Sequence, residues 1–282
     1  GLGNSIFSYS GNHIETNMQL WVAVGQGETN TLATSVDGIN WTGRGKIFSI
    51  CGKKIKFNGN IWVAVGEDID PKKNIAYSSD GITWNYPTTE IFSVMANDIV
   101  WAIDKWWAVG EGSSHLLASS SDGINWTGHT GQNVSVIRFN TIEFDGNYII
   151  AGGKSTHQNY QLYYSTNLGS SWSNSYLINN ASCEVLKLKN GNSSWMAIID
   201  YNAGNIAFNN YSLTSYSGWV TRSDVLNETN DILYDDERWL ALGSDTSSNI
   251  MFSDTLYMQS NSNLSLKDKE WGGVQTTGLV KA

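Results

Sequence analysis

The chain of 282 residues is short of proline, cysteine and charge, and each shortage excludes a class of protein. Two prolines exclude a proline-rich linker, and two cysteines are too few for a disulfide framework. Charged residues make up 15 %, against about 25 % in ordinary soluble domains. The net charge of −9 disfavours nucleic acid as a partner, because phosphate binding needs clustered lysine or arginine. No apolar run reaches the roughly 18 residues of a membrane-spanning helix, so membrane insertion is not expected.

Residues that bind metals or carry redox chemistry are few and isolated. Cys51 and Cys183 form neither a CxxC pair nor a zinc-binding spacing, and we expect them to be buried free thiols. The histidines occur singly, without an HExxH or His-x-His spacing: His13, His115, His129 and His157. The sequence therefore predicts no metal site and no cofactor.

Tryptophan and glycine are abundant, and the tryptophans recur at a steady spacing. The segment Trp21-Val-Ala-Val-Gly25 is repeated or echoed about every 44 residues, starting at Trp62, Trp106, Tyr148, Trp195 and Trp239. A second series of tryptophans follows these segments: Trp41, Trp84, Trp126, Trp172, Trp219 and Trp271. Each unit holds four short strand signals, which in the second unit are 54–57, 61–65, 74–77 and a fourth from residue 82 onward. Four antiparallel strands in each such unit are typical of a β-propeller blade.

The sequence thus predicts an all-β fold, a six-bladed β-propeller with four antiparallel strands per blade. We expect one domain over residues 1–282, with blades near 11–49, 50–93, 94–137, 138–180, 181–226 and 227–282. The segment Ile6-Phe7-Ser8 resembles residues 47–49 and 91–93, which follow a hairpin tryptophan. Residues 1–10 would therefore continue the pattern after Trp271, so that adjacent termini close the ring.

The first strand of each unit carries an aliphatic residue that we interpret as a packing anchor. The anchors are Ile14, Ile55, Ile99, Ile142, Leu186 and Ile232. The position directly after each anchor is occupied by Glu15, Lys56, Val100, Glu143, Lys187 and Leu233. The order acid, base, aliphatic occurs twice, which indicates duplication of a three-blade ancestor. Acid–base pairs along these strands are expected to be partly solvated and to stabilise the fold little.

A hairpin motif closes each of the first four units. Its first three copies have the spacing S-x-D-G-x-x-W and the fourth has one extra residue. The copies are Ser35, Asp37, Gly38, Trp41; Ser78, Asp80, Gly81, Trp84; Ser120, Asp122, Gly123, Trp126; and Ser165, Asn167, Gly169, Trp172. The Asp or Asn oxygen can accept backbone N–H groups inside the turn, glycine can adopt positive φ, and tryptophan can pack onto the blade. All three roles are structural.

This motif resembles the Asp-box (BNR) repeat of sialidase-like β-propellers. The resemblance implies the propeller fold, but the family includes hydrolases, lectins, assembly factors and surface proteins. Its sialidases bind a carboxylate with three arginines, and their usual Arg-Ile-Pro element is absent here. The only candidate triad is Arg44, Arg138 and Arg222, since Arg238 falls on the hairpin side. We therefore expect no catalytic residues.

The function we expect is a non-catalytic binding module for a carbohydrate or a cell-surface receptor. The candidate ligand residues lie in polar loops between second and third strands, opposite the hairpins: Glu28, Asp68, Glu111, His115, Lys154, His157 and Tyr160. Repetition of such loops would give avidity. A structural or scaffold protein of a virus particle or larger secreted protein is the alternative, with a sialidase-like hydrolase third. Either main role suggests an extracellular or virion-surface location.

Overall fold

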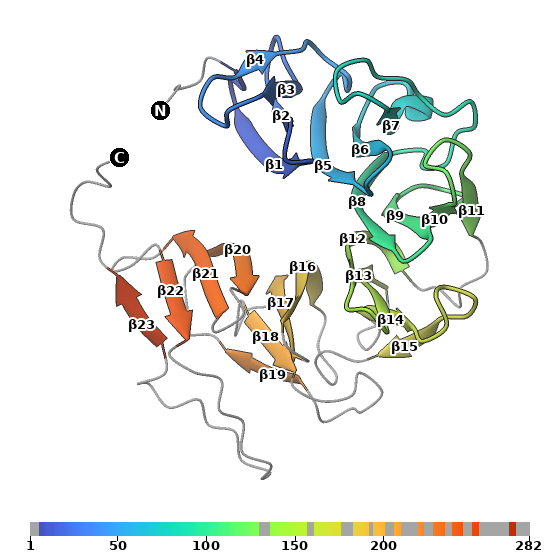
Figure 1. Ribbon diagram of the computed structural model, residues 1–282. Helices are drawn as coiled ribbons and strands as arrows, with labels where there is room; N and C mark the ends of the chain where they lie inside the picture. Colours follow the sequence, from blue (N-terminus) through green and yellow to red (C-terminus); the bar gives the residue numbers. More distant parts are fainter. Residues whose placement is uncertain are drawn as a thin grey trace. The chain divides into compact units, whose positions relative to one another are not determined.

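The computed structural model in Figure 1 consists of β-strands joined by loops. The structure describes residues 6–129, 136–156, 161–175, 183–191, 194–200, 206–209, 219–222, 228–234, 239–244, 250–253 and 271–274. Among them the only regular element that is not a strand is a short 3-10 helix at Pro71–Lys73. None of these residues belongs to a helix long and apolar enough to cross a membrane. The all-β expectation is confirmed, and the chain divides into two compact units, Gly1–Gly146 and Asn147–Ala282.

The first unit holds three antiparallel sheets and one further strand. The first sheet has the order β1 (Ser10–Thr16), β2 (Trp21–Gln26), β3 (Leu32–Ser35), β4 (Thr42–Gly43). The second is β5 (Cys51–Phe57), β6 (Trp62–Glu67), β7 (Ile75–Ser78). The third is β8 (Met95–Ala102), β9 (Lys105–Glu111), β10 (Leu117–Ser120), β11 (Thr127–His129), and β12 (Val136–Phe144) lies against β8 and β9. The fourth strand expected in the second unit is reduced to one bridge between Tyr77 and Asn85.

The second unit repeats the same pattern. Its strands are β13 (Ile149–Ser155), β14 (Leu162–Ser165), β15 (Ser173–Ser175); β16 (Glu184–Gly191), β17 (Ser194–Asp200), β18 (Ile206–Asn209), β19 (Trp219–Arg222); and β20 (Glu228–Tyr234), β21 (Trp239–Ser244), β22 (Ile250–Ser253), β23 (Trp271–Val274). A pair between Lys154 and Glu184 joins β13 to β16. Each group is a run of antiparallel hairpins, as the turn-rich sequence predicts.

The strand register separates the two ends of each sheet. Gln26, where β2 ends, pairs with Ser10 at the start of β1, whereas Trp21 pairs with Ser35 at the other end. The loop between the second and third strands and the hairpin that follows the third strand therefore lie at opposite ends of the sheet. This arrangement was expected from the sequence, and it recurs in the second sheet with Cys51–Glu67 and Trp62–Ser78.

The core lies between the faces of consecutive sheets. In the first unit, Val22 and Val24 of β2 pack with Ile55 and Trp62 of the second sheet, and all four are buried. The interface between the second and third sheets contains residues at the equivalent positions, Val63, Val65, Ile99 and Trp106. The second unit contains the equivalent set Met196, Ile198, Ile232 and Trp239. Burial of large apolar side chains between sheets is the main stabilising term. Four tryptophans of the first series are core residues, Trp62, Trp106, Trp195 and Trp239, whereas Trp21 is 37 % exposed.

The anchor proposed for the fifth repeat is wrong by two residues. Leu188 pairs with Ala197 as Ile55 pairs with Ala64, and Leu188 is 1 % exposed. Leu186 instead falls within a β-bulge and is 40 % exposed. Lys189, not Lys187, is then the counterpart of Lys56. The acid, base, aliphatic order survives with this change, because one lysine replaces another.

Candidate functional site

The first Ser-Asp-Gly turn, at residues 35–41, is held by its own side chains. Ser35 Oγ donates to Asp37 Oδ1 at 2.9 Å and accepts the Gly38 N–H at 2.9 Å. Asp37 Oδ1 accepts the backbone N–H groups of Ile39 and Asn40 at 2.8 and 2.7 Å. Gly38 has φ +73°, a conformation that glycine adopts without steric cost. The second and third copies repeat these bonds: Ser78, Asp80, Gly81 and Ser120, Asp122, Gly123.

The tryptophan of the motif completes the turn. Trp41 Nε1 donates to the Gly38 carbonyl at 3.1 Å, and Trp84 and Trp126 do the same to their glycines. Trp126 is buried, whereas the other two are half-buried. A Cβ on Gly81 would lie 2.8 Å from Leu20, which directly precedes β2, so this turn also packs against the first sheet. The structural role predicted for the motif is therefore supported by its geometry.

In the fourth copy of the turn, a neutral asparagine replaces the aspartate. Asn167 Oδ1 accepts the Ser165 hydroxyl and the Ser171 N–H, both at 2.9 Å. The extra residue, Leu168, takes φ +53°, followed by Gly169 at +81°. Trp172, which ends this copy, is half-buried. An amide oxygen thus serves where the first three copies have a carboxylate.

Hydrogen bonds stabilise the ionised form of the carboxylates in the Ser-Asp-Gly turns. The backbone N–H of Thr83, followed by that of Ile82, lowers the pKa of Asp80 to about 2. The backbone N–H of Asn40 holds the pKa of Asp37 below its usual range. Burial alone would raise the pKa of Asp122, but the bonds from Asn125 outweigh it, and its pKa also lies below its usual range. These carboxylates are ionised acceptors, which makes them unsuited to donating a proton near neutral pH.

Asp80→Ala is expected to lower the free energy of unfolding by about 1 kcal/mol at pH 7, because two turn N–H groups lose their acceptor. The folded pKa lies below the ordinary value of 3.8, so this contribution is complete above pH 4 and is lost as the pH falls towards 2. Urea unfolding at several pH values measures it. Asp80→Asn is the matched control, since Asn167 fills this role in the fourth copy; a loss as large as that of Asp80→Ala would contradict the assignment.

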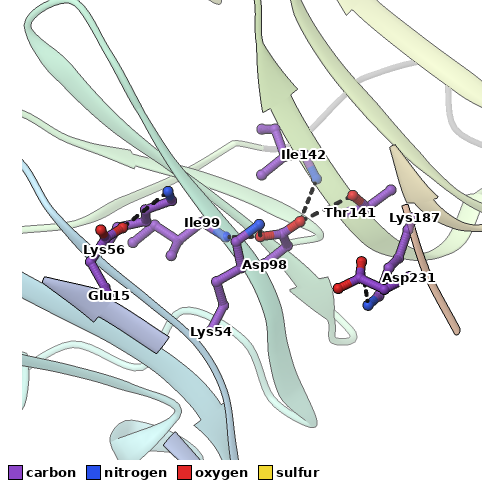
Figure 2. Close-up of polar contacts among 9 residues, drawn as sticks. All are labelled: Glu15, Lys54, Lys56, Asp98, Ile99, Thr141, Ile142, Lys187 and Asp231. Atoms are coloured by element: carbon purple, nitrogen blue, oxygen red, sulfur yellow. Dashed lines mark hydrogen bonds and ion pairs between the residues drawn. The ribbon is translucent and has the colours of Figure 1, made fainter. Parts of the chain in front are cut away.

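Polar contacts connect the first strands of neighbouring sheets within each unit (Figure 2). In the first unit, Glu15 pairs with Lys56 at 3.0 Å and Lys54 with Asp98 at 2.7 Å. Asp98 also accepts the Thr141 hydroxyl at 3.0 Å. Its carboxylate is 7 % exposed, so the solvated pairs expected from the sequence include one buried pair. In the second unit Lys187 pairs with Asp231 at 3.1 Å.

The loops between second and third strands are each fixed by a serine of the Ile-Phe-Ser segments. Ser8, Ser49 and Ser93 accept the backbone N–H of Glu28, Ile69 and Ser113, at 2.7, 2.9 and 2.8 Å. The side chains at the loop tips are exposed: Glu28, Thr29, Ile69, Asp70, Ser113 and Ser114. We call these six residues the loop row. The serine triplet was visible in the sequence as a repeat, but its role was not predicted.

The bases of the first two loops are fixed as well. Thr31 is fully buried and its hydroxyl donates to the Phe48 carbonyl at 3.0 Å. Asn74, 1 % exposed, donates to the Phe92 carbonyl at 2.9 Å and accepts the Asp68 N–H at 2.8 Å. Buried polar groups that are fully bonded rigidify the backbone around them. The loop row is therefore presented on a rigid base.

The predicted ligand residues are distributed among these loops and strands. Glu28 belongs to the loop row and accepts the Tyr9 hydroxyl at 3.1 Å. Asp68 is half-buried and accepts the Ser49 and Asp70 N–H groups at 2.6 and 2.9 Å, which is a loop-shaping role. None of the bonds described here joins one predicted ligand residue to another.

The other predicted ligand residues do not belong to the loop row, and two of them lie outside the described residues. Glu111 ends β9 and faces Arg138 at 3.8 Å, and the half-buried His115 packs on Gly128. Lys154 lies within β13, not in the loop expected there, 3.6 Å from Glu184. His157 and Tyr160 lie outside the described residues.

A serine–histidine contact in the third sheet was not predicted. His129 Nε2 lies 2.8 Å from Ser119 Oγ, and its ring stacks on Trp107 with centroids 5.1 Å apart. Ser119 is 7 % exposed, and burial, with Lys105 and His115, lowers the pKa of His129. A nucleophilic serine must be accessible to its substrate. We therefore assign this contact to the packing of β10 against β11.

The described arginines are held in separate places. Arg44 Nε donates to Thr34 Oγ1 at 2.8 Å beside the third strand of the first sheet. Arg138, on β12, faces Glu111. Nothing is described of the Arg222 side chain. The described residues contain no group of three or more His, Cys, Asp or Glu side chains placed to hold a metal ion. Both cysteines are free and buried, as expected.

No family model and no curated protein sequence matches the chain. Solved structures do: YCF48 from Cyanidioschyzon merolae has a TM-score of 0.63 at 16 % identity, over 87 % of this chain and 82 % of that one. YCF48 bound to D1 peptide has a TM-score of 0.61 at 13 % identity, over 87 % and 78 %. A GH74 enzyme of Niastella koreensis has 0.62 at 12 %, over 92 % and 44 %. These likenesses show a β-propeller fold.

Proposed function

We propose that the protein is a non-catalytic binding module that recognises its partner through the loop row. The observation that carries this proposal is the serine bond that fixes each of three consecutive loops at the same backbone position. Such repetition fixes the loop backbone beneath the exposed side chains without a partner. Pre-organised groups lose less entropy on binding, which is how a surface gains affinity.

The chemistry of the loop row favours a polar ligand, a carbohydrate or the surface of a cell receptor. Carboxylate and hydroxyl groups are exposed at Glu28, Thr29, Asp70, Ser113 and Ser114. They can accept and donate hydrogen bonds to hydroxyl-rich ligands. Among the fold neighbours, one structure is bound to a peptide, which supports recognition by this type of fold without indicating the ligand here.

The proposal also includes the finer architecture. We assign the hairpins to the Asp-box (BNR) repeat and the repeats to six blades of one closed, sialidase-like propeller. The support is the recurrence of the Ser–Asp–Gly turn in three sheets and its Asn form in a fourth. An extracellular or virion-surface location belongs to the same proposal.

Binding is tested with the full chain on a glycan array and on cells that carry surface glycoproteins. Specific binding to a glycan or receptor, with no turnover of a fluorogenic sialoside, is the expected result. The absence of binding to every glycan and cell type at high protein density would contradict recognition and favour the scaffold role. Turnover above blank would contradict the non-catalytic assignment.

A further inference from the structure

The Ser-Asp-Gly turns of the first three sheets expose an isoleucine at the same position, directly after the glycine. The exposed fraction of the side chain is 73 % for Ile39, 46 % for Ile82 and 37 % for Ile124. Their backbone N–H groups donate to the turn carboxylates, so the backbone that carries each isoleucine is fixed. Single exposed apolar residues are common, but a large one that recurs in three consecutive turns indicates a contact surface.

Two further apolar side chains lie at the same end of the sheets, in the turns between first and second strands. Trp21 pairs with Thr16 on one side and with Ser35 on the other, so the turn between β1 and β2 lies at the same end as the Ser-Asp-Gly turn. The third sheet has the same register. Met18, in the turn between β1 and β2, is 96 % exposed, and Ile103, in the turn between β8 and β9, is 60 % exposed.

Contacts between consecutive sheets join these turns into one surface of the first unit. A Cβ on Gly81 would lie 2.8 Å from Leu20, in the turn between β1 and β2. A Cβ on Gly123 would lie 3.3 Å from Ile61, in the turn between β5 and β6. The second and third Ser-Asp-Gly turns are thus packed beside the first turn of the preceding sheet. We call the turns at residues 17–20, 36–40, 58–61, 79–83, 103–104 and 121–125 the hairpin face.

The charged residues of the hairpin face are all acidic. Its turns contain four aspartates and no lysine or arginine: Asp37, Asp80, Asp104 and Asp122. All four are exposed. The hydrogen bonds of the Ser-Asp-Gly turns hold the pKa values of three of them below the usual range, so these carry a negative charge at neutral pH. The hairpin face therefore combines exposed aliphatic side chains with negative charge.

This combination distinguishes between possible occupants of the face. A second copy of the same face would bring like charges together, which disfavours self-association. An anionic lipid surface is repelled for the same reason. Lysine or arginine side chains that alternate with aliphatic ones would complement both the charge and the apolar groups. Such a pattern is found on basic amphipathic segments, which bind a surface through regularly spaced apolar anchors.

We propose that the hairpin face of the first unit docks a basic amphipathic segment of a partner protein. Aliphatic side chains of the partner pack on Ile39, Ile82 and Ile124, and its lysine or arginine side chains lie beside the turn aspartates. The strand register puts the hairpin face and the loop row at opposite ends of the sheets. This contact is therefore separate from the ligand site proposed above, and glycan-array binding is an independent readout of that site.

A short amphipathic peptide of leucine and lysine, carrying a fluorophore, is the probe. Its anisotropy is measured as the full chain is added. Two matched peptides carry glutamate in place of lysine or serine in place of leucine. The leucine–lysine peptide should bind at least about tenfold more tightly than either control, because only this peptide supplies both positive charge and apolar anchors. Absence of binding, or equal affinity for either control peptide, would overturn the proposal.

Apolar substitutions locate the peptide on the protein. The double variant Ile82→Ser with Ile124→Ser should lower the affinity for the leucine–lysine peptide about tenfold or more, since two apolar contacts are lost. Ile69→Ser, at an exposed isoleucine of the loop row, is the matched control and should leave the affinity unchanged. Equal effects at the two ends would overturn the proposal. Dimers in light scattering that the double variant dissociates would also overturn it, because a second copy would then cover the face.

Charge substitutions test the second half of the proposal. Asp80→Asn with Asp104→Asn removes two negative charges from the hairpin face and should lower the affinity about threefold or more at low salt. The control pair, Glu28→Gln with Asp70→Asn, removes the same charge from the loop row and should have no effect. If both pairs lower the affinity equally, the peptide senses only the net charge of the protein, and docking at the hairpin face is overturned.

Discussion

Asp98→Ala is expected to lower the free energy of unfolding by about 3 to 5 kcal/mol, the loss typical when one partner of a buried ion pair is removed. The lysine at 2.7 Å, Lys54, is itself only 13 % exposed and would lose this carboxylate from its side. The Thr141 hydroxyl and the Ile142 N–H would lose the same acceptor. Urea unfolding followed by circular dichroism measures the change.

Asp104→Ala is the matched control for this prediction. Asp104 is an exposed carboxylate in the turn between β8 and β9, so its removal should change the free energy of unfolding by less than about 0.5 kcal/mol. If Asp98→Ala lowers the free energy of unfolding by less than about 1 kcal/mol, the carboxylate does not hold β5, β8 and β12 together.

Trp106→Ala should cost about 3 to 5 kcal/mol, as for other large buried aromatics. The side chain is fully buried between the second and third sheets, and its ring lies 5.0 Å from that of Trp101. A Cβ on Gly123 would lie 3.1 Å from Trp106 Nε1, so the ring also supports the Ser-Asp-Gly turn. The same unfolding measurement applies.

Trp106→Phe distinguishes packing from a general effect of substitution. It keeps an aromatic ring against Trp101 and should lose less than half as much stability as Trp106→Ala. Equal losses for the two variants would contradict the packing role. Little loss in either would contradict the placement of the first tryptophan series in the core.

The Ser-Asp-Gly turns could be predicted from the sequence because their bonds are local. Ser35, Asp37 and Gly38 lie within four residues, so one motif contains every partner. The first tryptophan series was predictable for a related reason: a side chain as large as Trp62, recurring at a fixed interval, indicates a repeated core position. Both features depend on residue type and short spacing alone.

The remaining features depend on partners far apart in the chain. Asp98 meets Lys54 and Thr141 more than 40 residues away, and neither spacing is a recognised motif. The anchor predicted for the fifth repeat was wrong because Leu186 and Leu188 would share one face of a regular strand. The bulge in β16 breaks this regularity, and the sequence pattern does not reveal it. The Ile-Phe-Ser segments were found as a repeat, but their serines act on loops about 20 residues downstream.

Recognition at the loop row is tested most directly by one substitution made at opposite ends of a sheet. Ile69 is 81 % exposed in the loop row, and Ile39 is 73 % exposed in a Ser-Asp-Gly turn. The protein should therefore fold equally well with arginine at either position. Affinity for the ligand found on the array should fall about tenfold or more in Ile69→Arg and stay unchanged in Ile39→Arg. Full affinity in Ile69→Arg, with loss in Ile39→Arg, would contradict recognition at the loop row.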